Sequence, residues 1–230
     1  MLEVLNMLGR KPGIKKTVSL LRLDGSDEML SATQIKDSAN PNRIWTLTSG
    51  SVLSTEKMKF GTKAFKISGG YGLNTPHDPT MFEGSVQTLE MWVNIWDYSV
   101  FNFFMSKTAT DTQHPYVRQY GSNMFLEVSY DGSAGGSGNT NSLFTAGNWA
   151  HIALVINGTT KRLYLNGILV RTDTNALTWG KLAYPFIIGS NNRRNSSDTK
   201  SRFYAQAFRL SNVVRYSGNF VPPDANFELD

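Results

Sequence analysis

The sequence predicts an all-β protein, built as a two-sheet antiparallel sandwich and preceded by a short N-terminal arm. Runs rich in Val, Ile, Phe, Tyr, Thr and Trp alternate with clusters of Gly, Asn, Asp and Ser, and about ten such runs occur. After residue 17, no segment carries an apolar stripe at helical spacing over more than about two turns. Alternating strands with one apolar face must bury that face against a second sheet.

Length and composition are consistent with a single sandwich after the arm. The chain has 230 residues, no Cys, and 23 Lys and Arg against 18 Asp and Glu. The lack of cysteine excludes disulfides, thiol nucleophiles and Cys-ligated zinc. No apolar run approaches the ~20 residues that cross a bilayer. Residues 1–8 lack the basic start and small-residue cleavage site of a cleaved signal, so we expect neither a leader nor a membrane partner.

Residues 1–17 form the predicted arm, and residues 18–230 form the predicted domain. The arm combines an apolar stripe at near-helical spacing with basic residues around a Lys-Pro-Gly break. Its candidate partner-binding residues are Leu2, Leu5, Leu8, Arg10, Lys11, Lys15 and Lys16. A helix this short is marginal alone in water, so we expect the stripe to dock. The sequence leaves open whether it docks on its own domain or on a neighbouring subunit.

The strands of the domain follow from their periodicity. Residues 88–96 alternate, with aliphatic residues on one face and Glu90, Trp92, Asn94 and Trp96 on the other. Residues 151–156 are almost continuously apolar, as in a strand covered on both faces. Asn166-Gly167 between two apolar runs predicts a hairpin with a type I′ turn. Further strands are expected at residues 19–23, 64–68, 103–107, 116–120, 124–130, 185–188 and 203–210, and residues 132–138 are expected to connect strands.

Three stretches carry a family resemblance. They are GNWAHIALV at residues 147–155, KRLYLNGILV at residues 161–170 and LEMWV at residues 89–93. Together they resemble concanavalin A-like jelly rolls of the laminin G and pentraxin type, over about residues 20–227. The ending FRLSNVVRYSGNFVPP at residues 208–223 is similar to the C-terminal part of such domains in tailed-bacteriophage virion proteins. The resemblance implies a jelly roll with two curved antiparallel sheets.

The sequence does not favour catalysis. Glucanases of this architecture use two closely spaced carboxylates, and the retaining reaction needs them about 5–5.5 Å apart. Here Glu90 is followed on the same strand face by Trp92 and Asn94, so the second carboxylate is missing. His77, His114 and His151 show no metal-ligand spacing, and no G-x-S-x-G motif presents a serine. We therefore expect no enzymatic activity and no catalytic residues, with Glu90 salt-bridged or solvated.

Calcium is the cofactor that the resemblance implies, because many relatives hold it with several oxygen ligands. The candidate ligands are Asp24, Asp27, Asp131 and Asp173. Where many relatives carry two acidic residues in the C-terminal strand, this chain has Gln206 and Ala207. We therefore expect no cofactor and leave calcium as an open alternative.

Glycan binding needs an aromatic platform and a few fixed polar groups. The candidates are Tyr71, His77, Asp78, Trp96, Tyr98, Tyr116 and Tyr120. No spacing rule ties them into one site.

These observations favour a non-enzymatic virion structural protein of a bacteriophage. The first hypothesis is a capsid decoration protein, a homo-oligomer or lattice-bound subunit that docks on other capsid or tail subunits through its arm. The alternative is a carbohydrate-binding module of a tail or receptor-binding structure that recognises host surface glycans. A third is a hydrolase with an unrecognised carboxylate pair. Nucleic acid is a weaker candidate partner, because the basic stretch at residues 181–215 matches no nucleic-acid motif.

Overall fold

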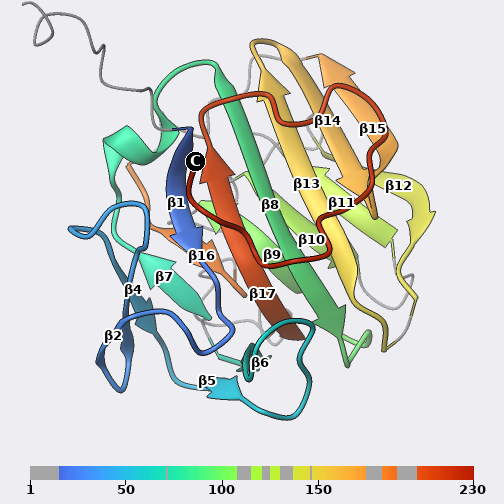
Figure 1. Ribbon diagram of the computed structural model, residues 1–230. Coiled ribbons are helices and arrows are strands. Elements are labelled where there is room, and N and C mark those ends of the chain that lie inside the picture. Colours follow the sequence, from blue (N-terminus) through green and yellow to red (C-terminus); the bar gives the residue numbers. More distant parts are fainter. Residues whose placement is uncertain are drawn as a thin grey trace, which may run out of the picture.

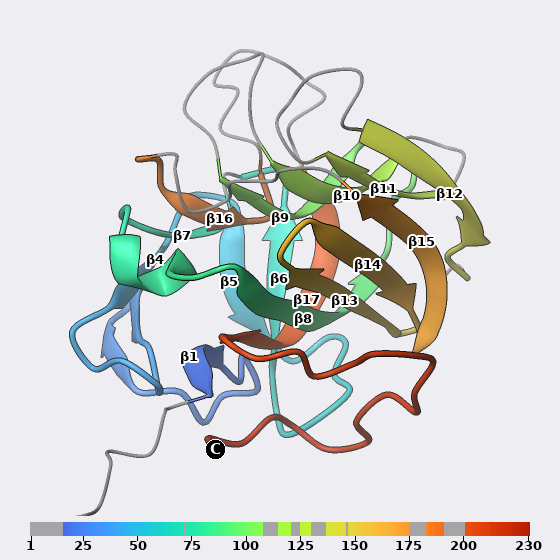
Figure 2. The ribbon, with the colours of Figure 1, turned by 90° about the horizontal axis from the view of Figure 1, so that it is seen from above.

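The computed structural model describes residues 16–70, 72–107, 115–120, 125–129, 137–145, 147–174, 183–190 and 201–230. Two antiparallel sheets lie face to face, which confirms the predicted fold class (Figures 1 and 2). The described residues include one short 3-10 helix, η1 (Pro79–Phe82). No helix in the described ranges is long and apolar enough to cross a membrane.

The front sheet has eight strands. Its order is β15 (Ile168–Thr174), β14 (Thr160–Leu165), β13 (Ala150–Asn157), β8 (Val86–Ile95), β17 (Arg202–Ser211), β6 (Ala64–Ser68) and β5 (Ser51–Ser54). The eighth strand, β1 (Thr17–Leu21), pairs with β17.

The back sheet has nine strands. Its order is β12 (Ser137–Leu143), β11 (Phe125–Ser129), β10 (Tyr116–Tyr120), β9 (Asn102–Lys107), β16 (Phe186–Ile188), β7 (Leu73–Thr75), β4 (Ile44–Leu47), β3 (Gln34–Lys36) and β2 (Met29–Ser31).

The core fills the space between the sheets. The aliphatic face of β8 points into it, and Leu89 and Met91 are fully buried, as the alternation predicts. From the back sheet, Trp45 packs edge-on against Phe208 of β17, with ring centroids 5.6 Å apart. A bulge in β17 at Ala207, where φ is 52°, shifts the pairing register and turns Phe208 into this core.

The predicted hairpin is confirmed. β14 and β15 are joined by Asn166 and Gly167, whose φ angles are 51° and 77°. Two positive φ values in a two-residue loop are those of a type I′ turn. The expectation that residues 151–156 are covered on both faces is also confirmed, because every one of these side chains is buried.

The C-terminal segment covers the outer face of β13, and the sequence did not predict this. Residues 212–230, here called the C-terminal strap, run across the outer face of the front sheet (Figures 1 and 2). Tyr216 and Phe220 of this strap stack face to face, and Phe220 packs against Tyr164 of β14. The strap therefore adds a third layer to half of the sandwich.

Several strands were not predicted, because they are short and polar. β2, β3, β4, β5 and β7 have only three or four residues each, too few for alternation to stand out. Residues 132–138 were expected to connect two strands, but β12 already begins at Ser137. Residues 132–136 lie outside the described ranges. Residues 1–15 of the predicted arm also lie outside them, and Thr17 already belongs to β1.

Candidate functional site

The outer face of the front sheet carries the acidic residue that the sequence singled out. Glu90 on β8 and His151 on β13 are fully buried beneath the strap. Arg209 on β17 donates to Oε1 of Glu90 from Nε at 2.8 Å, and its NH2 group lies 2.7 Å from the same oxygen. Tyr216 of the strap donates from its hydroxyl to Oε2 at 2.7 Å, and His151 Nε2 lies 3.2 Å from Oε2. Glu90 is therefore salt-bridged and not solvated, which is the first of the two expected states.

These contacts fix the charge state of the cluster. Burial alone raises the pKa of Glu90, but the contact with His151 and the charge of Arg209 outweigh it and hold the pKa below its usual value. Burial and the neighbouring carboxylate of Glu90 raise the pKa of Tyr216 far above its ordinary range. The groups that contact Glu90, namely Arg209, His151 and Tyr216, are cationic or neutral. Glu90 is thus an ionised carboxylate whose two oxygens are both engaged by protein groups.

A second candidate site is the exposed end of the same sheet. Trp96, which follows β8, is 43% exposed, whereas Trp92 on the same strand face is buried. The ammonium of Lys66 lies 6.0 Å from the Trp96 ring centroid, and the guanidinium of Arg202 lies 5.9 Å from it. Lys66 pairs with Glu56 at 2.6 Å, and Arg202 pairs with Asp97. The indole is therefore surrounded by paired donors and acceptors with no net charge.

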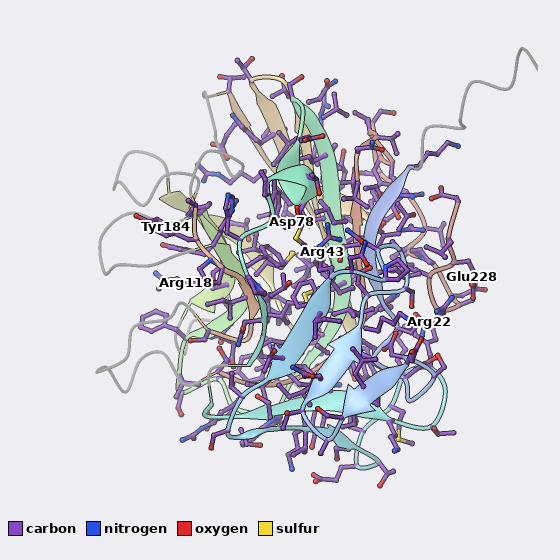
Figure 3. All side chains as sticks on the ribbon, turned by 90° about the vertical axis from the view of Figure 1, so that its left-hand side faces the viewer. Arg22, Arg43, Asp78, Arg118, Tyr184 and Glu228 are labelled. Carbon is purple, nitrogen blue, oxygen red and sulfur yellow. The ribbon has the colours of Figure 1, made fainter. Side chains whose placement is uncertain are left out.

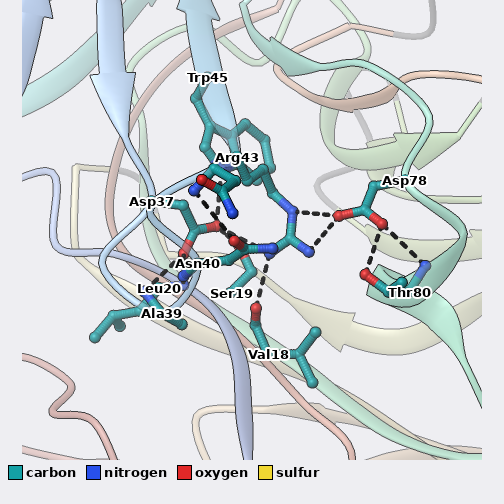
Figure 4. A network of polar contacts seen from close by, with 11 residues as sticks. Val18, Ser19, Leu20, Asp37, Ala39, Asn40, Arg43, Trp45, Asp78 and Thr80 are labelled. Carbon is teal, nitrogen blue, oxygen red and sulfur yellow. Dashed lines mark hydrogen bonds and ion pairs between the residues drawn. The ribbon is translucent and has the colours of Figure 1, made fainter.

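A third candidate lies where β3 and β4 meet the loop before η1. Arg43 is 4% exposed and bridges two carboxylates, with NH1 3.3 Å from Asp37 and NH2 2.6 Å from Asp78 (Figure 4). NH1 also donates to the carbonyl of Val18 at 2.7 Å, and Asp37 accepts from Trp45 Nε1 at 3.1 Å. This network clamps β1 to the β3–β4 hairpin.

A shallow hollow of about 370 Å³ opens beside this network. Its lining residues are Asn42, Arg43, Ile44, Thr75, Pro76, His77, Asp78 and Pro79. His77 Nδ1 is buried there without a hydrogen-bond partner. The hydrogen bonds and charge of Arg43, together with the bonds from Thr80, hold the pKa of Asp78 below its usual value against the opposing effect of burial.

Lys107 at the end of β9 is an unusual buried cation. The residue is 1% exposed, and Nζ has no hydrogen-bond partner among the described residues. The ammonium lies 4.6 Å from the ring centroid of Phe82 in η1. Burial lowers the pKa of Lys107 to about 8.

The structure does not bring the described glycan-binding candidates into one site. His77 and Asp78 line the hollow next to η1, whereas Trp96 follows the far end of β8 (Figure 1). Tyr98 packs against the main core, and burial raises its pKa to about 12. Tyr116 is buried on β10 with the guanidinium of Arg118 4.6 Å from its ring centroid.

Two of the candidates can be placed only in part or not at all. Tyr120 is the last residue of β10, and Tyr71 lies outside the described ranges. Of the seven candidate partner-binding residues of the arm, only Lys16 is described. It is exposed, and its carbonyl accepts from the backbone of Asn212 at 2.9 Å.

The calcium candidates are engaged in turn and loop contacts. Asp24 accepts from Ser26, Asp27 accepts from the backbone of Arg22 and Leu23, and Asp173 pairs with Arg171. Asp131 lies outside the described ranges. Within those ranges, no group of three or more His, Asp or Glu side chains is placed to hold a metal ion.

Sequence reasoning missed Arg209, Tyr216 and Lys107. Arg209 follows the bulge at Ala207, so simple alternation from the start of β17 puts it on the wrong face. Tyr216 reaches Glu90 over 126 residues of sequence, and no local pattern carries that contact. The one available signal was the concentration of Tyr and Phe in the last 20 residues, which is unusual for a solvated tail.

Two antiparallel sheets packed face to face define a β-sandwich protein with a jelly-roll fold. The model of the concanavalin A-like lectin/glucanases superfamily matches residues 68–215. The chain therefore belongs to this superfamily, as the resemblance indicates. No curated protein sequence gives a significant match.

Solved structures agree on the fold. A Trypanosoma rangeli sialidase superposes with a TM-score of 0.63 at 17% identity, covering 88% of this chain and 31% of the sialidase. Domain 4 of AbnA, a GH43 extracellular arabinanase from Geobacillus stearothermophilus in complex with arabinotriose, superposes with a TM-score of 0.65 at 16% identity. The match covers 87% of this chain and 94% of that domain. The botulinum neurotoxin serotype D binding domain superposes with a TM-score of 0.59 at 12% identity, covering 86% of this chain and 49% of the neurotoxin domain. The chain thus spans less than a third of the sialidase, and these likenesses establish the fold alone.

Proposed function

We propose that this chain is a non-enzymatic structural protein of a bacteriophage virion, a capsid decoration protein that docks on other virion subunits through its arm. The non-enzymatic part of the proposal rests on one observation: protein groups contact both carboxylate oxygens of Glu90. A retaining glycosidase needs a second carboxylate about 5–5.5 Å away, with room for a sugar between the two. Both oxygens of Glu90 are instead occupied, by Arg209 on one side and by His151 and Tyr216 on the other.

The base of the arm supports the docking part of the proposal. Thr17 begins β1 and pairs with Ser211 of β17. Its hydroxyl donates to Asp230 of the strap and accepts from Arg215 at 3.2 Å. The described end of the arm, residues 16–17, is therefore held by both the front sheet and the strap. A fixed base lowers the entropic cost of docking a short segment on a partner.

Deletion of residues 1–15 tests this proposal, because it leaves β1 intact. We expect the shortened chain to keep its thermal transition and to lose attachment to particles prepared without the protein, measured by co-sedimentation. Because salt screens exposed charges, a matched variant with Arg10, Lys11 and Lys15 replaced by Ser should attach less tightly than wild type at low salt and should depend less on salt. Full attachment of the shortened chain would refute docking through the arm.

The exposed indole favours a second candidate function, a carbohydrate-binding module. Trp96 offers an apolar ring face to a sugar, and the pairs Lys66 with Glu56 and Arg202 with Asp97 offer donors and acceptors at its edge. The arabinanase domain that shares this fold was solved with arabinotriose bound.

For this function, Trp96→Ala should abolish binding to surface glycans of the host without altering the thermal transition. Ile168→Ala is the matched control, because Ile168 is also an exposed apolar residue but lies at the distant β14–β15 turn. Tyr98→Ala is a poor test, because Tyr98 packs against the core. A glycan array that stays blank, with and without calcium, would count against this candidate.

A further inference from the structure

The end of the C-terminal strap is attached to the domain in the manner of a bound peptide. The last backbone-to-backbone bond of the strap is donated by Phe220 to the carbonyl of Gly167 at 2.9 Å. Beyond it, residues 221–230 make no such bond with any described residue. Val221 is 90% exposed, and Pro222 and Pro223 follow it. We call residues 224–230 the tail, and residues 221–223 link it to the rest of the strap.

One aromatic side chain anchors the tail. Phe227 is 2% exposed and sits in a slot on the outer face of the front sheet. Apolar side chains from several strands and loops line this slot: Leu20, Ala39, Phe60, Trp92, Trp149 and Ala207. The guanidinium of Arg209 lies 4.2 Å from the centroid of the Phe227 ring. A buried aromatic with a cation on its face is a typical binding hot spot.

Polar contacts flank the anchor on both sides. Asn226 donates to the carboxylate of Asp24 at 2.8 Å. Glu228 pairs with Arg22 at 2.9 Å, and Figure 3 shows these two side chains next to each other. Asp230 accepts two bonds from Arg215, at 2.8 and 3.0 Å. The tail thus presents Asn, Phe, Glu and Asp at fixed spacing to a complementary surface.

We propose that this slot is a peptide-binding groove and that its partner in trans is the tail of a second copy of this chain. The attachment depends on side chains, so the tail can leave and return without disrupting either sheet. Each copy carries both the groove and the matching tail, which is the condition for exchange of a segment between identical subunits. Among the described segments, the tail is the one with the aromatic and acidic residues that fit Phe227's slot, Arg22 and Arg215.

The first part of the test uses the full chain with Phe227→Ala, which empties the slot. A labelled peptide of residues 221–230 should bind this variant, and its fluorescence anisotropy should rise on titration. The same peptide with Ala in place of Phe227 should bind at least about thirtyfold more weakly, because it lacks the anchor. The wild-type chain, whose slot is filled, should bind the peptide at least about tenfold more weakly than the variant. No binding to the variant would overturn the groove.

The second part tests the identity of the partner. Deleting Pro222 and Pro223 shortens the link by roughly 7 Å, so that Phe227 no longer reaches its own slot. Such a chain should form a dimer in size-exclusion chromatography with light scattering, and the added substitution Phe227→Ala should return it to a monomer. A monomer that still binds the free peptide would refute exchange between copies. A dimer unaffected by Phe227→Ala would refute it too.

Discussion

Arg209 and Glu90 are cross-strand partners in the register of β17 and β8, and their side chains form a buried ion pair with a 2.8 Å hydrogen bond. Glu90, the one candidate for a glucanase-type carboxylate, is therefore neutralised by an arginine on the neighbouring strand. The strap closes the pair from above with the hydroxyl of Tyr216. A buried, ionised carboxylate strongly destabilises the folded state if these partners are removed.

Arg209→Met should destabilise the chain by about 3–5 kcal/mol, because it leaves Glu90 charged, buried and without its main counter-ion. Urea denaturation measures the change. The matched variant is Glu90→Gln combined with Arg209→Met, which removes both charges and should recover much of the loss. If the single substitution cost no more than the double one, the buried charge of Glu90 would not depend on Arg209.

The same pair predicts loss of stability in acid. The pKa of Glu90 in the folded chain lies below its unfolded value of 4.5, so the folded state favours the ionised form. The resulting stability is present above pH 4.5 and falls as the pH drops through the folded pKa. Comparing wild type with Glu90→Gln in urea between pH 7 and pH 3 isolates this contribution. Parallel pH profiles for the two chains would contradict it.

Lys107 predicts that stability also rises with pH in the alkaline range. Burial lowers its pKa from 10.5 to about 8 in the folded chain. Between pH 8 and pH 10.5 the unfolded state holds more protons, so the free energy of unfolding rises with pH. The difference between the two pKa values corresponds to at most about 3 kcal/mol. Lys107→Met should stabilise the chain at pH 7 by up to that amount and remove the rise.

Lys161→Met is the matched control for this prediction. Lys161 is also buried, but its ammonium donates to the carbonyl of Thr159 at 3.2 Å. Removing it should therefore gain little or cost stability. An equal gain from both substitutions would show that the missing partner of Lys107 is not what costs stability.

A substitution at Gly167 tests how closely the strap packs against the β14–β15 hairpin. Its φ is +77°, and a Cβ there would lie 1.9 Å from the carbonyl oxygen of Phe220. Gly167→Ala should destabilise by about 3 kcal/mol or more, because it combines backbone strain with a clash that lifts the strap. Gly158→Ala is the control, with φ +59° and no atom within 4 Å of the Cβ, and should cost about 1–2 kcal/mol. Equal costs would exclude the clash.

The last residue of the tail should loosen in strong acid before the domain unfolds. Hydrogen bonds from Arg215, together with that from Thr17, lower the pKa of Asp230 to about 2. The contact is present above pH 3.8 and lost as the pH falls through 2. Because the Asp230 side chain is 36% exposed, the change in stability should stay below about 1 kcal/mol, too little to release Phe227 from its slot. NMR chemical shifts of residues 228–230 between pH 5 and pH 1.5 would report the loss, and shifts equal at every pH to those of the free peptide of residues 221–230 would contradict it.

Local patterns predicted the long strands well. Alternation placed β8 and its two faces, and Asn166-Gly167 placed the β14–β15 turn, because strand periodicity and positive φ are properties of a few neighbouring residues. The short strands β2 to β5 were missed, because three or four residues show no period. The glycan candidates did not converge, since nothing in the spacing of Trp96 and His77 reports that they lie at different ends of the sandwich.

The sequence by itself determined the all-β class, the superfamily and the place of Trp92 and Trp96 on the strand face opposite the aliphatic stripe; the structure showed that Trp96 is the exposed one. Only the tertiary structure decided what becomes of Glu90. Its fate depends on a bulge that turns Arg209 outward and on a strap that returns over more than 100 residues to bring Tyr216 to it. Contacts at that separation depend on how whole sheets pack, and no periodicity along the chain records them.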